Sequence, residues 1–142
     1  MDIKNKLHQV DLIPKNSIVI GSGILNALNI RISKDIDVVV TEEKYKQLSA
    51  HPRFKKEHKH NRETLTDGLF EIMTNWTVMK KNWSYHNLLP YSIIINGIQY
   101  ITIEFLFNAK QSWLADGSIR QKDIDDIKLM KGYLSKNKLS PT

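Results

Sequence analysis

Residues 19–40 read VIGSGILNALNIRISKDIDVVV, and this stretch decides how the chain begins to fold. A short apolar run that stops at a glycine predicts a strand over residues 17–20 and a turn at 21–23. The spacing of apolar residues in 24–28 predicts a short helix after the turn. The apolar run 36–40 predicts a second strand. This stretch therefore predicts four consecutive features: a strand, a glycine turn, a helix and a second strand.

Two aspartates flank the start of the second predicted strand. Side chains alternate along a strand, so Asp35 and Asp37 project from one face while Ile36 packs into the core on the other. Like charges on one face repel each other, which indicates that a positive group binds there.

Composition indicates one globular domain. The chain has 142 residues, of which 41% are hydrophobic and 25% are charged, with a net charge of +6 and no cysteine. This length suits one hydrophobic core, so we expect a single domain over 1–142, with residues 136–142 as a flexible tail. The lack of cysteine excludes disulfides, thiolate metal sites and cysteine nucleophiles, and it fits a cytoplasmic location. No uninterrupted apolar run is long enough for a membrane span, so no membrane partner is expected.

The rest of the chain predicts a mixed sheet flanked by helices, which is an α+β (α/β) fold. Periodicity and turn signals predict the following elements: helices over 2–10, 42–48, 104–114 and 122–134, and strands over 69–73, 92–95 and 99–103. The last two strands form a hairpin around Asn96-Gly97. Thr41 is expected to cap the helix 42–48. The basic region 53–66 is expected to hold one edge strand followed by a loop.

The glycine turn and the aspartates suggest complementary chemistry. A strand that ends in Gly21-Ser22 and opens a helix directs free backbone amides at one point, where phosphate oxygens bind well. Asp35 and Asp37 supply hard oxygen ligands of the kind that hold Mg²⁺ together with substrate phosphates. The glycine turn and the two aspartates together suggest a site for a metal-bound nucleotide.

The combination of a strand, a Gly-Ser turn, a short helix and a hydrophobic-D-hydrophobic-D-hydrophobic strand resembles the signature of the nucleotidyltransferase superfamily. This superfamily includes DNA polymerase beta and small bacterial minimal nucleotidyltransferases. The resemblance implies the nucleotidyltransferase fold, with Gly21 and Ser22 holding the nucleotide triphosphate and Asp35 and Asp37 binding Mg²⁺. It also implies a third acidic residue on a later strand.

Two glutamates compete for the third position. Glu71 lies in the middle of a predicted strand, in the F-E-I pattern that matches the superfamily. Glu104 lies where a strand passes into a helix, a place where a glutamate often stabilises the helix start. The pattern favours Glu71 as the third catalytic and metal-binding carboxylate, and Glu104 remains the alternative.

The resemblance continues into the C-terminal half. The segments EFLFNAK (104–110) and RQKDIDDI (120–127) are similar to the ending of many bacterial nucleotidyltransferase-like proteins, including the nucleotidyltransferases of toxin–antitoxin systems. In those relatives the helix lysine faces the active site. The resemblance therefore implies that Lys110 binds the nucleotide phosphates, with Asp123 as a supporting nucleotide-binding residue.

These features predict a Mg²⁺-dependent enzyme that transfers a nucleoside monophosphate from an NTP, such as ATP, to a hydroxyl of a protein, an RNA or a small molecule. The alternative is an inactive, antitoxin-like regulatory protein with a partner protein or an RNA ligand. A basic set would bind the RNA: Arg53, Lys55, Lys56, Lys59 and Arg62. A metal-dependent phosphohydrolase is a third possibility.

Overall fold

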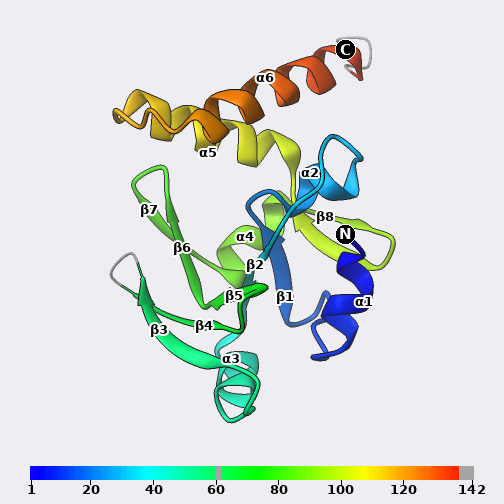
Figure 1. Ribbon diagram of the computed structural model, residues 1–142, viewed down its shortest axis with the longest axis vertical. Helices are drawn as coiled ribbons and strands as arrows, with labels where there is room; N and C mark the ends of the chain where they lie inside the picture. Colours follow the sequence, from blue (N-terminus) through cyan, green and yellow to red (C-terminus); the bar gives the residue numbers. More distant parts are fainter. Residues whose placement is uncertain (60–61, 138–142) are drawn as a thin grey trace.

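A mixed β-sheet forms the centre of the protein (Figure 1). The structure, a computed structural model, describes residues 1–59 and 62–137. Within these residues the sheet has seven strands, in the order β3 (Lys55–Lys59), β4 (Arg62–Thr66), β5 (Phe70–Met73), β2 (Ile36–Val40), β1 (Ser17–Ile20), β9 (Ile98–Ile101) and β8 (Ser92–Ile95). A separate hairpin is formed by β6 (Asn75–Val78) and β7 (Lys81–Ser84).

The helices lie around this sheet. They are α1 (Ile3–His8), α2 (Gly23–Ala27), α3 (Glu42–Ser49), α4 (Tyr85–Leu88), the 3₁₀ turn η1 (Leu89–Tyr91), α5 (Ile103–Ala115) and α6 (Gln121–Lys136). The predicted cap is present, because the Thr41 hydroxyl accepts a hydrogen bond from the Lys44 amide at the start of α3. Within the described residues, none of the helices combines the length and apolar character that a membrane span requires.

The two central strands are apolar because both of their faces are covered. All four residues of β1 are buried, and in β2 only Asp37 is partly exposed. β1 pairs antiparallel with β2, and β2 pairs in parallel with β5. The parallel pairing of β2 with β5 brings together the carboxylates of Asp37 and Glu71, which are distant in sequence.

Aromatic side chains attach the C-terminal half to the β6–β7 hairpin. Phe105 of α5 lies with its ring 5.8 Å from that of Trp76 and 5.0 Å from that of Trp83. α5 and α6 lie together at one end of the molecule, and α3 lies at the other (Figure 1). The aromatic contacts therefore fix the position of the helical layer that adjoins the glycine turn.

The structure differs from the sequence expectations mainly between residues 53 and 66. We expected one edge strand followed by a loop, but β3 and β4 form a hairpin at the sheet edge. β3 is charged and solvent-exposed, as suits an edge strand, while β4 is held inward by the fully buried Leu65 opposite Ile72. Of the predicted tail 136–142, Lys136 still belongs to α6, and residues 138–142 lie outside the described part of the chain.

Two glycines in helices provide a test of the packing. A Cβ at Gly23 would lie 2.3 Å from Cγ1 of Val19, whereas nothing lies within 4 Å of a Cβ at Gly132 in α6. We expect Gly23→Ala to lower the free energy of unfolding by about 1–3 kcal/mol through overpacking. Gly132→Ala, the matched control, should raise it by up to about 1 kcal/mol through helix propensity. Urea unfolding measures both, and equal effects of the two substitutions would contradict the packing of α2 on β1.

Candidate functional site

Three carboxylates meet at one end of the central strands. Asp37 and Glu71 are direct neighbours in the register of the parallel β2–β5 pair, so their side chains share a face of the sheet. Asp35 lies immediately before β2, two residues from Asp37, and its charge acts on that residue. Residues separated by more than thirty positions therefore form one acidic cluster.

The environment of Asp37 disfavours its negative charge. Burial, followed by the charges of Asp35 and Glu71, raises the pKa of Asp37 to about 7, while Lys122 acts in the opposite direction. Oδ1 of Asp37 is buried and has no hydrogen-bond partner among the described residues. A buried carboxylate oxygen without a donor favours the approach of a cation.

Gly21 brings the glycine turn against this cluster. Its φ of +61° lies in the left-handed region, which favours glycine. A Cβ at this position would lie 2.9 Å from Oδ2 of Asp37. Only glycine thus permits the turn and the carboxylate to approach so closely.

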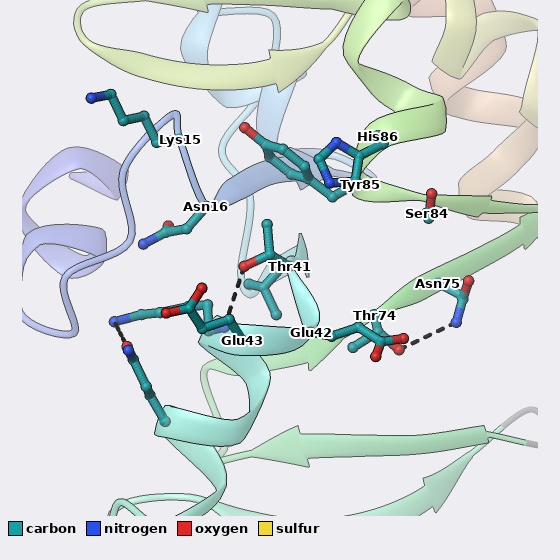
Figure 2. A pocket seen from close by; sticks show the side chains of 13 residues that line it. Lys15, Asn16, Thr41, Glu42, Glu43, Thr74, Asn75, Ser84, Tyr85 and His86 are labelled. Atoms are coloured by element: carbon teal, nitrogen blue, oxygen red, sulfur yellow. Dashed lines mark hydrogen bonds between the residues drawn. The ribbon is translucent and has the colours of Figure 1, made fainter.

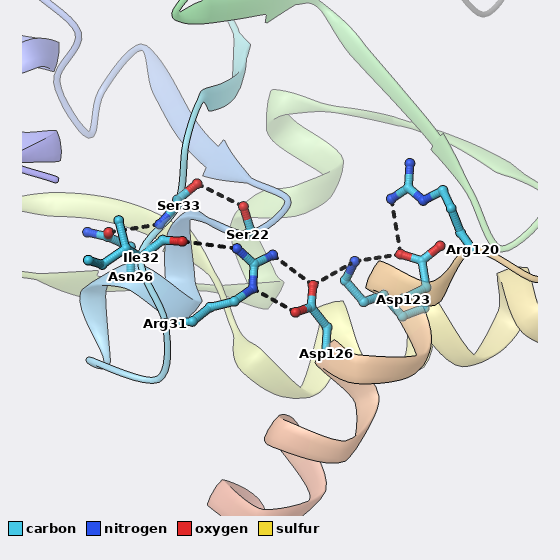
Figure 3. Close-up of polar contacts among 9 residues, drawn as sticks. Ser22, Asn26, Arg31, Ile32, Ser33, Arg120, Asp123 and Asp126 are labelled. Atoms are coloured by element: carbon cyan, nitrogen blue, oxygen red, sulfur yellow. Dashed lines mark hydrogen bonds and ion pairs between the residues drawn. The ribbon is translucent and has the colours of Figure 1, made fainter.

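Two serine hydroxyls connect the glycine turn to the loop before β2 (Figure 3). The hydroxyls of Ser22 and Ser33 lie 2.8 Å apart, and the Ser33 hydroxyl donates to the backbone carbonyl of Asp35. The Ser22 hydroxyl does not cap α2. Ser22 therefore supports the loop that carries Asp35 as well as flanking the cluster.

Two basic side chains of the β3–β4 hairpin lie near the carboxylates. The Lys59 ammonium of β3 donates a hydrogen bond to Glu71. Arg62 of β4 is half-buried, and its Nε has no hydrogen-bond partner among the described residues. Burial lowers the pKa of Arg62, against the opposing effect of Glu71 and Asp37. Lys59 and Arg62 belong to the predicted RNA-binding set, but the structure directs their charges to the acidic cluster.

A second set of charges is buried between α5, α6 and the loop before β2 (Figure 3). Lys110 is 4% exposed, and its Nζ lies 2.7 Å from Oδ1 of Asp123 and 3.2 Å from Oδ2 of Asp126. Arg31 donates two hydrogen bonds to Asp126, of 2.6 and 2.8 Å, and Arg120 donates one to Asp123. We call Arg31, Lys110, Asp123 and Asp126 the ion cluster.

A cavity lies at the far end of β2, away from the carboxylates (Figure 2). It has a volume of about 520 Å³ and is bordered by Thr41 at the start of α3. Its lining includes the basic residues Lys15 and Lys44 and the acidic residues Glu42 and Glu43. Asp35, Asp37 and Glu71 are not among its lining residues.

Comparison with known proteins gives one informative match. The sequence matches no protein-family model and no curated protein sequence. The solution structure of the antibiotic-resistance factor ANT(2'')-Ia, an aminoglycoside nucleotidyltransferase, superposes with a TM-score of 0.63. The match covers 97% of this chain and 88% of that chain, at 15% sequence identity. The chain has the nucleotidyltransferase fold. The expectation drawn from the Gly-Ser turn and the aspartates is thereby confirmed for the fold.

The nucleotidyltransferase fold gathers most of the predicted site residues. Gly21 and Glu71 lie against Asp37, the charge of Asp35 acts on Asp37, and Ser22 follows Gly21 in the turn. Glu104 instead lies in the first turn of α5 and borders an apolar groove with Ile24, Ile103 and Tyr133. The geometry thus favours Glu71 over Glu104.

Lys110 and Asp123 occupy a different environment from the one their motif suggested. Both side chains are buried and paired with each other inside the ion cluster, so the Lys110 ammonium is not presented to a ligand. Among the described residues, the basic residues that act on the carboxylates are Lys59, Arg62, Lys122 and, through Asp35, Arg31. No local pattern indicated them, because strand pairing and helix docking create their proximity.

The three carboxylates have the donor chemistry of a magnesium site. Hard oxygen ligands, mutual repulsion and the unpartnered Oδ1 of Asp37 fit a divalent cation. Among residues 1–59 and 62–137, no group of three or more acidic or histidine side chains is already arranged around a common metal position. Glu71 is paired with Lys59 instead, so binding a cation requires that this contact be exchanged.

The raised pKa of Asp37 predicts how stability depends on pH. Because this pKa is about 7 in the folded protein, against an ordinary value of 3.8, the folded state holds the proton more tightly than the unfolded state. The stabilisation is complete below about pH 4 and is lost as the pH rises through about 7. As the pH rises from about 4 to above 7, the unfolding free energy of the wild type should therefore fall relative to that of Asp37→Asn. Urea unfolding across this range, with Asp125→Asn as a control, tests it; a constant difference between wild type and Asp37→Asn would contradict it.

Adjacent aspartates on α6 test the ion cluster. Burial alone would raise the pKa of Asp126, but Arg31 and Lys110 outweigh it and hold this pKa below its usual range. We expect Asp126→Asn to cost about 3 kcal/mol of unfolding free energy, because it removes the carboxylate partner of Arg31 and one of the two carboxylates that contact the buried Lys110. In the described part of the chain, the exposed Asp125 carboxylate accepts one hydrogen bond, from the Gln121 side chain, so Asp125→Asn should cost less than about 1 kcal/mol. The Asp126 contribution is lost as the pH falls through the lowered pKa. Similar thermal stabilities for the two variants would contradict this role.

Proposed function

We propose that the protein is a nucleotidyltransferase that uses Mg²⁺ to transfer a nucleoside monophosphate from an NTP to a hydroxyl group. The observation that carries this proposal is the meeting of Asp35, Asp37 and Glu71 beside Gly21 within the nucleotidyltransferase fold. The acceptor hydroxyl would belong to a protein, an RNA or a small molecule. The chain 1–142 would act as one domain, and its lack of cysteine suits the cytoplasm.

The acidic cluster supports metal binding more strongly than a structural role. A purely structural cluster of three carboxylates would be destabilising, because like charges repel and Asp37 is largely removed from water. Asp35, Asp37 and Glu71 would hold Mg²⁺. Bound there, Mg²⁺ supplies charge neutralisation and alignment of the nucleophile with the phosphoryl group.

The residues of this chain would perform the remaining tasks. The backbone at Gly21 and Ser22 would hold triphosphate oxygens, since the absence of a side chain at Gly21 lets the turn approach Asp37 closely. One carboxylate of the cluster would take the proton of the acceptor hydroxyl. The acceptor oxygen would then bond to the α-phosphorus while the bond to the bridging oxygen breaks and pyrophosphate leaves.

Lys110 and Asp123 would contribute indirectly. Their burial in the ion cluster supports a role in holding α6 against the loop that carries Asp35, rather than direct contact with a nucleotide. We therefore propose that they position other groups of the nucleotide site.

Labelled NTPs provide the direct test. The protein is incubated with each α-³²P-labelled NTP, Mg²⁺ and pools of protein, RNA and small hydroxyl compounds. We expect label to appear on an acceptor together with pyrophosphate, and the double variant Asp35→Asn/Asp37→Asn to show no transfer. Equal transfer by this double variant would refute the role of the aspartates. Release of inorganic phosphate without labelled acceptor would indicate a phosphohydrolase instead.

The third carboxylate has its own matched pair of variants. Glu71→Gln should lower the rate of transfer by about 100-fold or more, because loss of a metal ligand removes several kcal/mol of transition-state stabilisation. Glu104→Gln, on the exposed first turn of α5, should leave the rate within about threefold of wild type. The reverse pattern would assign the third position to Glu104.

A further inference from the structure

Two lysines form ion pairs with carboxylates in the part of the chain that the structure describes, and their pairs differ in exposure to solvent. The side chains of Lys110 and Asp123 are 5% and 3% exposed. Those of Lys59 and Glu71 are 38% and 31% exposed, although the Lys59 ammonium lies 2.5 Å from Oε1 of Glu71. Opening a buried pair leaves an uncompensated buried charge, whereas an exposed pair contributes little to stability. The Lys59–Glu71 contact is therefore the one that can be exchanged for another partner.

Lys59 reaches the acidic cluster from the end of β3, the edge strand of the sheet. Besides Glu71, its ammonium lies 3.9 Å from Oε2 of Glu57, and the charge of Asp37 acts on it. Glu71 in turn neighbours Asp37 in the register of the β2–β5 pair. The Lys59 ammonium thus lies directly at one of the carboxylates proposed to hold Mg²⁺.

A metal ion and an ammonium group compete for the same carboxylate oxygens. In proteins Mg²⁺ is held by carboxylates together with substrate phosphates, so a metal-bound triphosphate brings phosphate oxygens to the acidic cluster. The lysine stem is flexible, and its ammonium binds phosphate oxygens as a point charge. When Mg²⁺ takes its place at Glu71, Lys59 therefore has a second anion available beside the carboxylate that it leaves.

We propose that Lys59 is an exchangeable cation of the nucleotide site, which pairs with Glu71 before the metal binds and with the triphosphate afterwards. The inference rests on the proposed function and supplies a phosphate contact that Lys110, paired inside the ion cluster, does not offer. Replacing Lys59 should have two effects of opposite sign. A metal ion alone should bind more tightly, and the NTP should bind more weakly to the metal-loaded protein.

Binding of a metal ion alone tests the contact with Glu71. Titration with Mn²⁺, followed by the electron paramagnetic resonance signal of the free ion, gives the Kd for wild type, Lys59→Gln and the control Lys56→Gln. Lys56 is an exposed residue of β3, three positions before Lys59, so its side chain projects from the opposite face. We expect Lys59→Gln to lower the Kd for Mn²⁺ by about two- to fivefold, because an exposed ion pair competes weakly. Lys56→Gln should change it by less than about 1.5-fold at physiological ionic strength, which screens exposed charges.

Binding of the nucleotide to the metal-loaded protein tests the contact with phosphate. Isothermal titration calorimetry in saturating Mg²⁺ gives the Kd of a non-hydrolysable analogue of each NTP, and of inorganic tripolyphosphate, for the same three proteins. We expect Lys59→Gln to raise the Kd of the NTP analogue and of tripolyphosphate by about 10-fold or more, as loss of a charge-assisted hydrogen bond does. Lys56→Gln should raise them by less than about twofold. Circular dichroism confirms that each variant is folded.

The outcomes separate this inference from the proposed function. If wild type binds neither Mn²⁺ nor any NTP analogue, both fail. If wild type binds them and Lys59→Gln leaves either affinity unchanged, or shifts both in the same direction, the exchange by Lys59 is overturned while the proposed function stands. A loss of NTP affinity without a loss of tripolyphosphate affinity would also overturn it, because Lys59 would then contact another part of the nucleotide.

Discussion

Repulsion among three carboxylates at one end of the sheet is the constraint on which the arrangement depends. Asp35, Asp37 and Glu71 are brought together by the parallel pairing of β2 with β5, and burial makes the charge on Asp37 costly. A protein retains such a cluster when a cation or cationic side chains compensate for it. Lys59 compensates for Glu71 directly, whereas Oδ1 of Asp37 has no hydrogen-bond partner among the described residues.

The ion cluster gives this end of the protein its rigidity. It joins α5, α6 and the loop after α2, whereas the aromatic contacts of Phe105 join α5 to the β6–β7 hairpin. A buried ion pair is weak evidence for net stability, since desolvation offsets much of the attraction. The ion cluster instead fixes the orientation of α6. Four charged groups that hydrogen-bond to one another allow few alternative positions for this helix. The orientation matters because Arg31 of the cluster lies on the loop that carries Asp35.

Most of the local structure could be predicted from sequence because it follows from local rules. The strand 36–40, the Thr41 cap and the Asn96-Gly97 hairpin all appear as alternation, capping chemistry and turn geometry require. The hairpin of β3 and β4 was missed because its stability comes from Leu65 packing opposite Ile72, not from the charged sequence of β3. The hairpin of β6 and β7 was not anticipated either, since its tryptophans pack on α5, a partner distant in sequence.

The sequence by itself determined the chemical types at the site: a glycine that tolerates a positive φ, two aspartates on one face of a strand and a glutamate on another. These follow from side-chain alternation and backbone sterics, which act over a few residues. Only the tertiary structure decided between Glu71 and Glu104 as neighbours of Asp37, and only it placed Lys110 inside the protein and Lys122 outside. Strand register and helix docking bring residues together across the chain, and each depends on burial of side chains that local sequence does not specify.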